Sequence, residues 1–169
     1  VDTGPIVVQK GGVPIGAHDT SASLYFDHLY PLGVEAMADA VAAVAEGRAE
    51  FLPQAEDGAS FQGLVDDEVA RLDWSLGGTE LDRRIRGCDP QPGAWAEYEG
   101  EPVRFYGGSL EAGVSHGETP GRVLDPDEEG RMRIAAAGET ALRITRVRRA
   151  EGKKVSAAES GIPVGGLFV

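Results

Sequence analysis

The side chains best suited to chemistry are few and widely spaced in this sequence. Its three histidines, His18, His28 and His116, match no metal-ligand spacing, and His28 falls in an apolar helical pattern that favours a structural role. The single Cys88 has no sequence-local base to activate its thiol, and we expect it to be a loop residue. No Gly-x-Ser-x-Gly elbow is present. Spacing therefore predicts neither a metal centre nor a nucleophilic triad.

Charged and glycine-rich segments add one candidate. The acidic runs at residues 66–68 and 125–129 favour solvated loops over calcium sites, and Gly11-Gly12 fits neither dinucleotide nor P-loop spacing. A basic cluster near the end is either a solvated face or an anion-binding surface. Its members are Arg143, Arg146, Arg148, Arg149, Lys153 and Lys154.

Charge is divided unevenly along the 169 residues, whose net charge is −12. Residues 1–100 hold 6 Lys/Arg against 18 Asp/Glu, and residues 101–169 hold 10 against 10. The acidic first part argues against a broad nucleic-acid face there. One cysteine excludes an internal disulfide, and no apolar run approaches the roughly 18 residues of a membrane helix. With no signal-peptide pattern at the start, the composition favours a cytoplasmic protein without membrane contact.

The first element expected is a strand at Pro5–Gln9, a short β-branched run bounded by glycines. Such a run is typical of a strand buried on both faces of a parallel sheet. Parallel neighbours come from crossover units, and no nearby segment supplies them. With the missing initiator Met, this mismatch predicts an absent N-terminal portion.

A helix is expected next, because Asp19-Thr20-Ser21 offers N-caps and apolar residues recur at helical spacing from Leu24 to Val44. Pro31 should kink or split it, and Gly47 suits the position after its end. We expect the aromatic and aliphatic stripe of this helix to pack in a core.

The rest of the chain predicts a linker followed by an α+β domain. Periodicity fades over residues 48–74, a short helix follows at 79–86, and residues 87–93 form a turn-rich loop. Glu99-Gly100-Glu101 indicates a tight hairpin, and the tail 155–169 resembles a cap rather than a flexible end. Five short strands after one helix suit an open barrel of the oligonucleotide/oligosaccharide-binding (OB) type. They are expected at 94–98, 102–106, 121–124, 132–136 and 141–147.

Three blocks, in order and over nearly the whole chain, resemble folate-dependent formyltransferases. Residues 2–9 (Asp-Thr-Gly-Pro-Ile-Val-Val-Gln) are similar to the family's Asp-Thr-Gly strand start. Residues 72–74 and 81–95 look like its helix and loop ahead of the barrel, and residues 151–157 look like its closing segment. Within the family, residues 85–87, 92–95 and 103–107 are most similar to the hydrolase domain of 10-formyltetrahydrofolate dehydrogenase, and methionyl-tRNA formyltransferase is the next relative.

The resemblance implies a division of the chain. Residues 1–47 would be the last strand and helix of an α/β (Rossmann-like) catalytic domain, 48–74 a linker, and 75–169 an OB-like C-terminal barrel. The family's catalytic Asn and His come from a preceding segment, including a His-Pro-Ser motif, that is absent from this sequence. The chain alone is therefore expected to be inactive, although the parent protein would be an enzyme.

The resemblance also implies the site. Asp2 matches the family's catalytic aspartate, and Thr3, Gly4 and Pro5 would shape a turn that brings backbone groups near the folate. A carboxylate leading into an apolar strand is partly desolvated, which raises its affinity for a proton and suits a base. The co-substrate would be 10-formyltetrahydrofolate, with no metal.

The formyl acceptor stays open between water and an amine: methionyl-tRNA, an amino sugar or a hydroxylated ornithine. For tRNA, the implied contacts are Arg143, Arg146, Arg148 and Arg149. A non-catalytic barrel that binds tRNA or a carrier domain, and an incomplete inactive product, are the alternatives.

Overall fold

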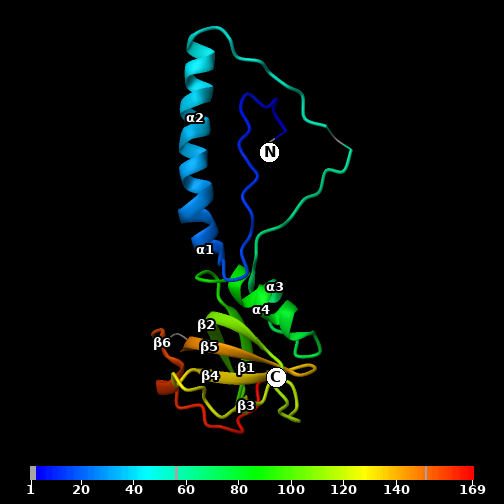
Figure 1. Ribbon diagram of the computed structural model, residues 1–169, viewed down its shortest axis with the longest axis vertical. Coiled ribbons are helices and arrows are strands. Elements are labelled where there is room, and N and C mark those ends of the chain that lie inside the picture. Colours follow the sequence, from blue (N-terminus) through cyan, green and yellow to red (C-terminus); the bar gives the residue numbers. More distant parts are fainter. Residues whose placement is uncertain (1–2, 56, 151) are drawn as a thin grey trace. The chain divides into compact units, whose positions relative to one another are not determined.

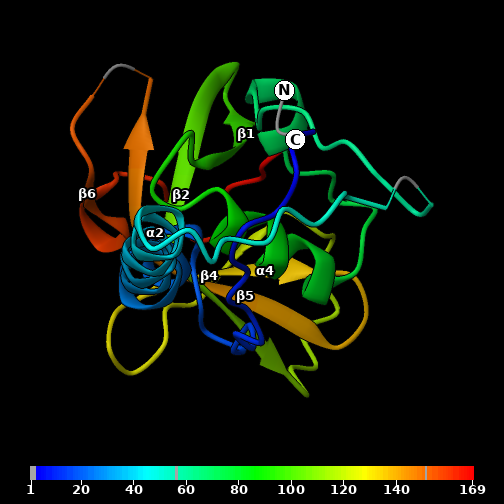
Figure 2. The same cartoon turned by 90° about the horizontal axis from the view of Figure 1, so that it is seen from above.

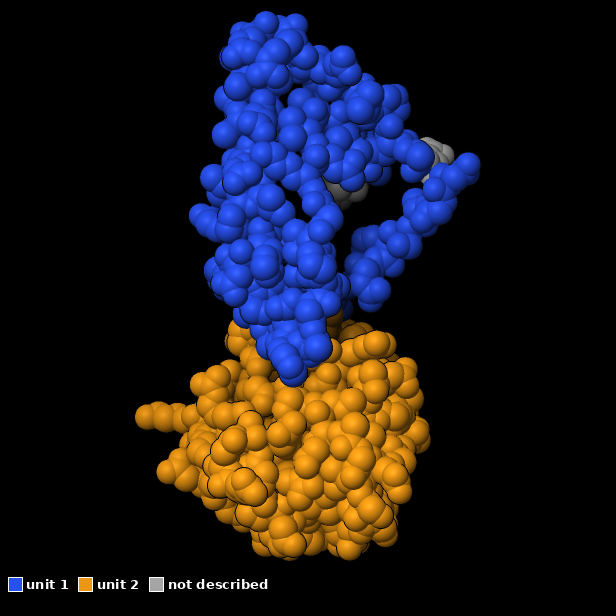
Figure 3. Space-filling model, in the orientation of Figure 1, with its two compact units in different colours: residues 1–64 blue, residues 65–169 orange. Residues whose placement is uncertain are grey.

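The computed structural model describes residues 3–55, 57–150 and 152–169. The chain forms two compact units, residues 1–64 and 65–169, coloured separately in Figure 3. The linker boundaries expected at residues 48 and 74 stay a prediction; Ala70 and Leu72 belong to the core of the second unit. Across the described residues, no helix has both the length and the hydropathy required to cross a bilayer.

One helical rod dominates the first unit. It consists of α1 (Ser21–Ser23), the π-helical stretch η1 (Leu24–Leu29) and α2 (Tyr30–Ala45), and Figure 2 shows the rod end-on. Thr20 caps it, because its side chain accepts from the Ser23 N–H while the Ser23 hydroxyl accepts from the Thr20 N–H. The Tyr30 N–H bonds to the Tyr25 carbonyl, five residues back. The helix is not split at Pro31: the rod is continuous from Ser21 to Ala45, and Pro31, which lacks an N–H donor, lies in the first turn of α2, directly after the π-helical stretch.

The strand expected at residues 5–9 is not formed. Among the described residues Ile6 makes a single antiparallel bridge with Leu52, at N···O distances of 2.8 and 2.9 Å, and its neighbours are extended without a ladder. A parallel strand needs neighbours on crossover units. The described residues of the first unit contain no crossover connection, so no parallel neighbour is present and Ile6 bridges to Leu52 instead.

The apolar stripe of the rod is exposed, against the expectation of a core position. Phe26 is 65% exposed and Met37 66%, and Tyr30, Val34 and Val41 are each more than half exposed. Only Ala43 is buried among the described residues of α2. An uncovered face of this size is typical of a surface that another protein segment covers.

The second unit is α+β, with two short α-helices, the 3₁₀ helix η2 (Ala157–Glu159) and one antiparallel sheet (Figure 1). The helices are α3 (Asp67–Ala70) and α4 (Gly78–Gly87). The strands are β1 (Ala94–Tyr98), β2 (Glu101–Ala112), β3 (Val123–Leu124), β4 (Met132–Ala136), β5 (Thr140–Arg149) and β6 (Val155–Ser156). Their order is β1-β2-β5-β4-β3, with β6 on β5, and the sheet curls into a half-barrel.

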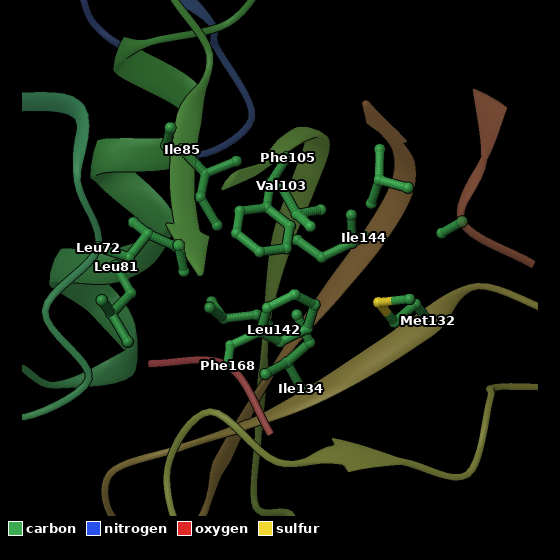
Figure 4. Packing of buried hydrophobic residues seen from close by; sticks show 14 of the residues in the cluster. Leu72, Leu81, Ile85, Val103, Phe105, Met132, Ile134, Leu142, Ile144 and Phe168 are labelled. Carbon is green, nitrogen blue, oxygen red and sulfur yellow. The ribbon is translucent and has the colours of Figure 1, made fainter. Parts of the chain in front are cut away.

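The core lies between α4 and the concave side of the sheet. Leu81 and Ile85, the apolar pair one turn apart on α4, are fully buried, which confirms the expected helix. In Figure 4 they face Phe105 of β2 and Leu142 of β5, together with Phe168 from the end of the chain. The expected hairpin is also confirmed: Glu99 and Gly100 have φ of 53° and 81°, and Tyr98 pairs with Glu101.

The C-terminal segment, residues 165–169, joins the two edges of the sheet. Val169 and Glu97 of β1 exchange two backbone hydrogen bonds of 2.8 and 3.0 Å. On the other side, Val123 of β3 donates to the Gly166 carbonyl and accepts from the Gly165 N–H. Phe168, between them, is 1% exposed. The tail is therefore an ordered cap, as expected from the sequence.

Candidate functional site

Residues 2–9, here called the N-terminal block, carry the predicted site, and the structure describes them from Thr3 onward. Asp2, the predicted catalytic residue, lies outside the described residues. The predicted substrate-binding residues Thr3, Gly4 and Pro5 are exposed. Gly4 has open space where a Cβ would stand, and its φ is not in the left-handed region. Neither packing nor backbone strain among the described residues requires a glycine there.

Polar contacts hold this block between α2 and the segment that follows the rod. The Gln54 side-chain amide donates to the Gly4 carbonyl at 2.7 Å, beside the Ile6–Leu52 bridge. Farther along, the Lys10 ammonium group contacts Glu35 at 3.1 Å and Asp39 at 2.8 Å, both on α2. The extended blue segment consequently runs alongside α2 (Figure 1).

A groove of about 480 Å³ opens between the block and α2. The helical wall consists of the small residues Gly33, Ala36 and Ala40 together with Met37, and residues 4–8 and Gln54 complete the groove. Its described lining offers apolar surface and amide groups but no acid, base or nucleophile. By themselves, these residues can hold an apolar or planar group and cannot catalyse proton transfer.

Other reactive side chains of the described chain do not gather into a site. His, Cys, Asp and Glu form no group of three that could hold a metal ion within the described residues. Cys88 lies in the turn directly after α4, as its C-cap, and its side chain packs in the core. Burial raises the pKa of its thiol, so it is a poor nucleophile at neutral pH.

The basic cluster divides into separate environments on the second unit. Arg149 contacts Glu101 at 3.3 Å and lies 5.8 Å from the Tyr98 ring centroid. Arg143 lies near the start of β5, where it pairs with Ser109 of β2 and Arg133 of β4. The four arginines expected to contact tRNA therefore do not form one continuous stripe.

Arg146, Arg148 and Lys154 do come together. The Lys154 ammonium lies 3.4 Å from the centroid of the Tyr106 ring, a cation–π contact. Burial lowers the pKa of Lys154; Asp89 opposes this shift, whereas Arg146 and Arg148 add to it. These interactions show that the cationic groups lie within electrostatic range of each other.

Arg104 and Asp67 form the neighbouring feature of this surface, and sequence reasoning missed both. The two guanidinium NH groups donate to the two carboxylate oxygens at 2.8 and 2.9 Å, and Trp95 Nε1 donates to the Asp67 carbonyl at 2.6 Å. Cross-strand alternation could have indicated the position, since Arg104 pairs with Arg148. That inference required the β2–β5 register, which the sequence alone does not fix.

Asp67→Asn should lower stability at pH 7 by less than about 1 kcal/mol, since exposed ion pairs contribute little. The hydrogen bonds from Arg104 hold the pKa of Asp67 below its ordinary value. The contribution is therefore present above the unfolded pKa of about 3.9 and is lost as the pH falls below it. Urea denaturation at pH 7 and pH 3 measures this. Asp125→Asn, in an exposed loop, is the control, and an equal deficit of Asp67→Asn at both pH values would contradict the ion-pair assignment.

Comparison with known proteins gives concordant matches. Residues 64–161 match the family model "Formyl transferase, C-terminal domain". Mitochondrial 10-formyltetrahydrofolate dehydrogenase of Mus musculus is 44% identical over 110 residues, which are 65% of this chain and 12% of that protein. Methionyl-tRNA formyltransferase of Dinoroseobacter shibae is 40% identical over 159 residues, 94% of this chain and 49% of that protein. The chain thus spans about half the length of the latter relative.

A solved structure shares the fold. HypX from Aquifex aeolicus superposes with a TM-score of 0.74 over 93% of this chain and 28% of its own, at 24% sequence identity. With the family match covering more than half of the residues, the chain belongs to the formyl transferase family and carries its C-terminal domain.

Proposed function

We propose that this chain is the C-terminal part of an enzyme that takes the formyl group of 10-formyltetrahydrofolate and gives it to water or an amine. The family match over residues 64–161 is the observation that carries the proposal. The matching dehydrogenase is named for 10-formyltetrahydrofolate, and a HypX structure with the same fold was solved with tetrahydrofolic acid. Both support a folate co-substrate.

We propose a division of the chain into three parts, as the family resemblance implies. Residues 1–47 would complete an α/β (Rossmann-like) catalytic domain, 48–74 would link it to the OB-like barrel, and the barrel would span 75–169. The exposed apolar face of α2 supports this division, because such a face suits packing against a parallel sheet. The groove beside residues 4–8 also supports it, since its described lining lacks the groups that formyl transfer needs.

Formyl transfer passes through a tetrahedral intermediate, so it requires donors for the oxyanion and a base for the attacking water or amine. We assign the base role to Asp2, acting directly or by orienting a histidine of the preceding segment. Thr3, Gly4 and Pro5 would line the folate site, with backbone groups facing the ring. No metal is needed for this chemistry.

The test compares this 169-residue chain with a longer protein that also contains the catalytic segment preceding Asp2. We expect the longer protein to consume 10-formyltetrahydrofolate and the short chain to show no turnover above background. Tetrahydrofolate release without an acceptor would identify water, and release that depends on an added amine would identify an amine. Failure of the longer protein with every acceptor would contradict the proposal.

A tRNA acceptor is the second candidate, favoured by methionyl-tRNA formyltransferases that match 94% of the chain. It would use Arg143, Arg146, Arg148 and Arg149. Filter binding of tRNA at two salt concentrations measures this, because phosphate contacts make affinity fall steeply with salt. Affinity that is weak and indifferent to salt would exclude the tRNA-binding role and favour water or a small amine.

A further inference from the structure

The outer face of the sheet around β2, β5 and β6 concentrates positive charge. Tyr106 pairs with Arg146 and Arg104 pairs with Arg148 across β2 and β5. Alternate residues of a strand share a face, so both pairs point the same way. β6 pairs with β5 on its other side, and Lys154, directly before β6, lies over the ring of Tyr106, the residue that pairs with Arg146. Cations from β2, β5 and the segment before β6 thus meet on one surface.

Most charges on this surface are not compensated by the described chain. Arg104 is bound by Asp67, but no ion pair joins Arg146, Arg148 or Lys154 to a carboxylate within the described residues. The Arg148 Nε is buried and has no hydrogen-bond partner there. The carboxylate that acts on Lys154 is Asp89, which accepts the Gly107 N–H at 2.8 Å. Among the described residues, the four cations of this surface, Arg104 included, face the two carboxylates of Asp67 and Asp89, which leaves a surplus of two positive charges.

This surplus and geometry suit a particular ligand chemistry. A carboxylate would neutralise only half of it, whereas a phosphoryl dianion matches it in charge and offers oxygens for guanidinium forks. The Arg104–Asp67 pair shows that the face already binds a planar oxyanion by such a fork. Lys154 covers the Tyr106 ring, so this ring is not free to stack a nucleobase.

We propose that Arg146, Arg148 and Lys154 form a binding site for a phosphoryl dianion, either free phosphate or the terminal phosphomonoester of a larger molecule. The site goes beyond formyl transfer, since none of its residues belongs to the N-terminal block; Arg146 and Arg148 are also contacts proposed above for a tRNA acceptor. Arg146 and Arg148 belong to the strand β5, and Lys154 lies directly before β6.

Calorimetric titration of the 169-residue chain with inorganic phosphate and with pyrophosphate tests the site. We expect saturable binding at one site, weakened at least about tenfold in the double variant Arg146→Gln/Arg148→Gln, because hydrogen bonds to charged groups are lost. The control is Arg83→Gln/Lys153→Gln, which removes the same charge from two exposed positions. Its affinity should stay within about twofold of the native value. If a thermal melt shows that the Arg146/Arg148 variant is unfolded, Arg146→Gln, at an exposed position, replaces it.

An oligonucleotide pair separates the sources of the phosphoryl group. Displacement of phosphate by a 5′-phosphorylated oligonucleotide, but not by its unphosphorylated twin, would support a terminal phosphomonoester. Displacement by neither would support free phosphate. The proposal is overturned if neither inorganic probe binds, if the control variant loses affinity equally, or if the unphosphorylated oligonucleotide competes as well, since that result describes a phosphodiester surface.

Discussion

Asp2→Asn should reduce kcat for formyl transfer by about 10²- to 10⁴-fold in the longer protein that carries the preceding catalytic segment. The amide cannot accept the proton of the attacking group, and it cannot hold a positively charged histidine as a carboxylate does. Because the side chain acts on the reacting atoms rather than on the folate ring, KM for 10-formyltetrahydrofolate should change little. Steady-state kinetics of tetrahydrofolate formation measures both constants.

The matched control for this variant is Asp27→Asn, an exposed aspartate of η1 in the same unit. It makes the same chemical change away from the N-terminal block, so its kcat should stay near native. Native turnover in Asp2→Asn would end the assignment of Asp2 as base or orienting residue. A rise in KM with unchanged kcat would instead identify Asp2 as a folate-binding residue.

Phe168→Ala should destabilise the second unit by about 3–5 kcal/mol, the range for truncating a buried aromatic side chain. The Phe168 ring lies 5.0 Å from that of Phe105 and 5.6 Å from that of Tyr98, and it stacks on Trp74 at 6.2 Å. Removing it leaves a cavity where the C-terminal segment joins the two sheet edges. Urea denaturation of the 169-residue chain, followed by tryptophan fluorescence, measures the loss.

Val169→Ala supplies the comparison for Phe168→Ala. Val169 keeps its backbone bonds to Glu97, and its side chain is 57% exposed, so truncation should change stability by less than about 1 kcal/mol. Similar losses in the two variants would show that the segment contributes through its backbone rather than through the buried ring.

The sequence predicts well those elements whose signals lie within a few neighbouring residues. α4 follows from its apolar pair Leu81 and Ile85, and the hairpin follows from Glu99-Gly100, where both residues adopt positive φ. The predicted range 102–106 is too short for β2, because Gly107-Gly108 indicated a strand end at Tyr106. The strand instead continues to Ala112. Gly108 serves packing and does not end the strand, because a Cβ there would lie 2.6 Å from the Ile85 side chain. The glycine there allows α4 to approach closely, a tertiary reason invisible to local pattern.

The candidate site shows the same division between local and distant information. The basic cluster was visible in sequence, but its separation into Arg143, Arg149 and the Arg146–Arg148–Lys154 surface depends on strand register. The expected strand at residues 5–9 and the buried stripe of α2 both presuppose a sheet that the described residues do not contain. Patterns selected for contact with another segment predict burial correctly only when that segment is present.

The pairing of residues 165–169 with both Glu97 and Val123 has a consequence for biosynthesis. Until residues 165–169 have emerged from the ribosome, β1 at Glu97 and β3 at Val123 lack their backbone partners, and the cavity that Phe168 fills stays open. Contacts between residues so distant along the chain also form slowly. The emerging polypeptide therefore passes through a state with an incomplete, aggregation-prone sheet, and the second unit completes its fold only after Val169 has left the exit tunnel.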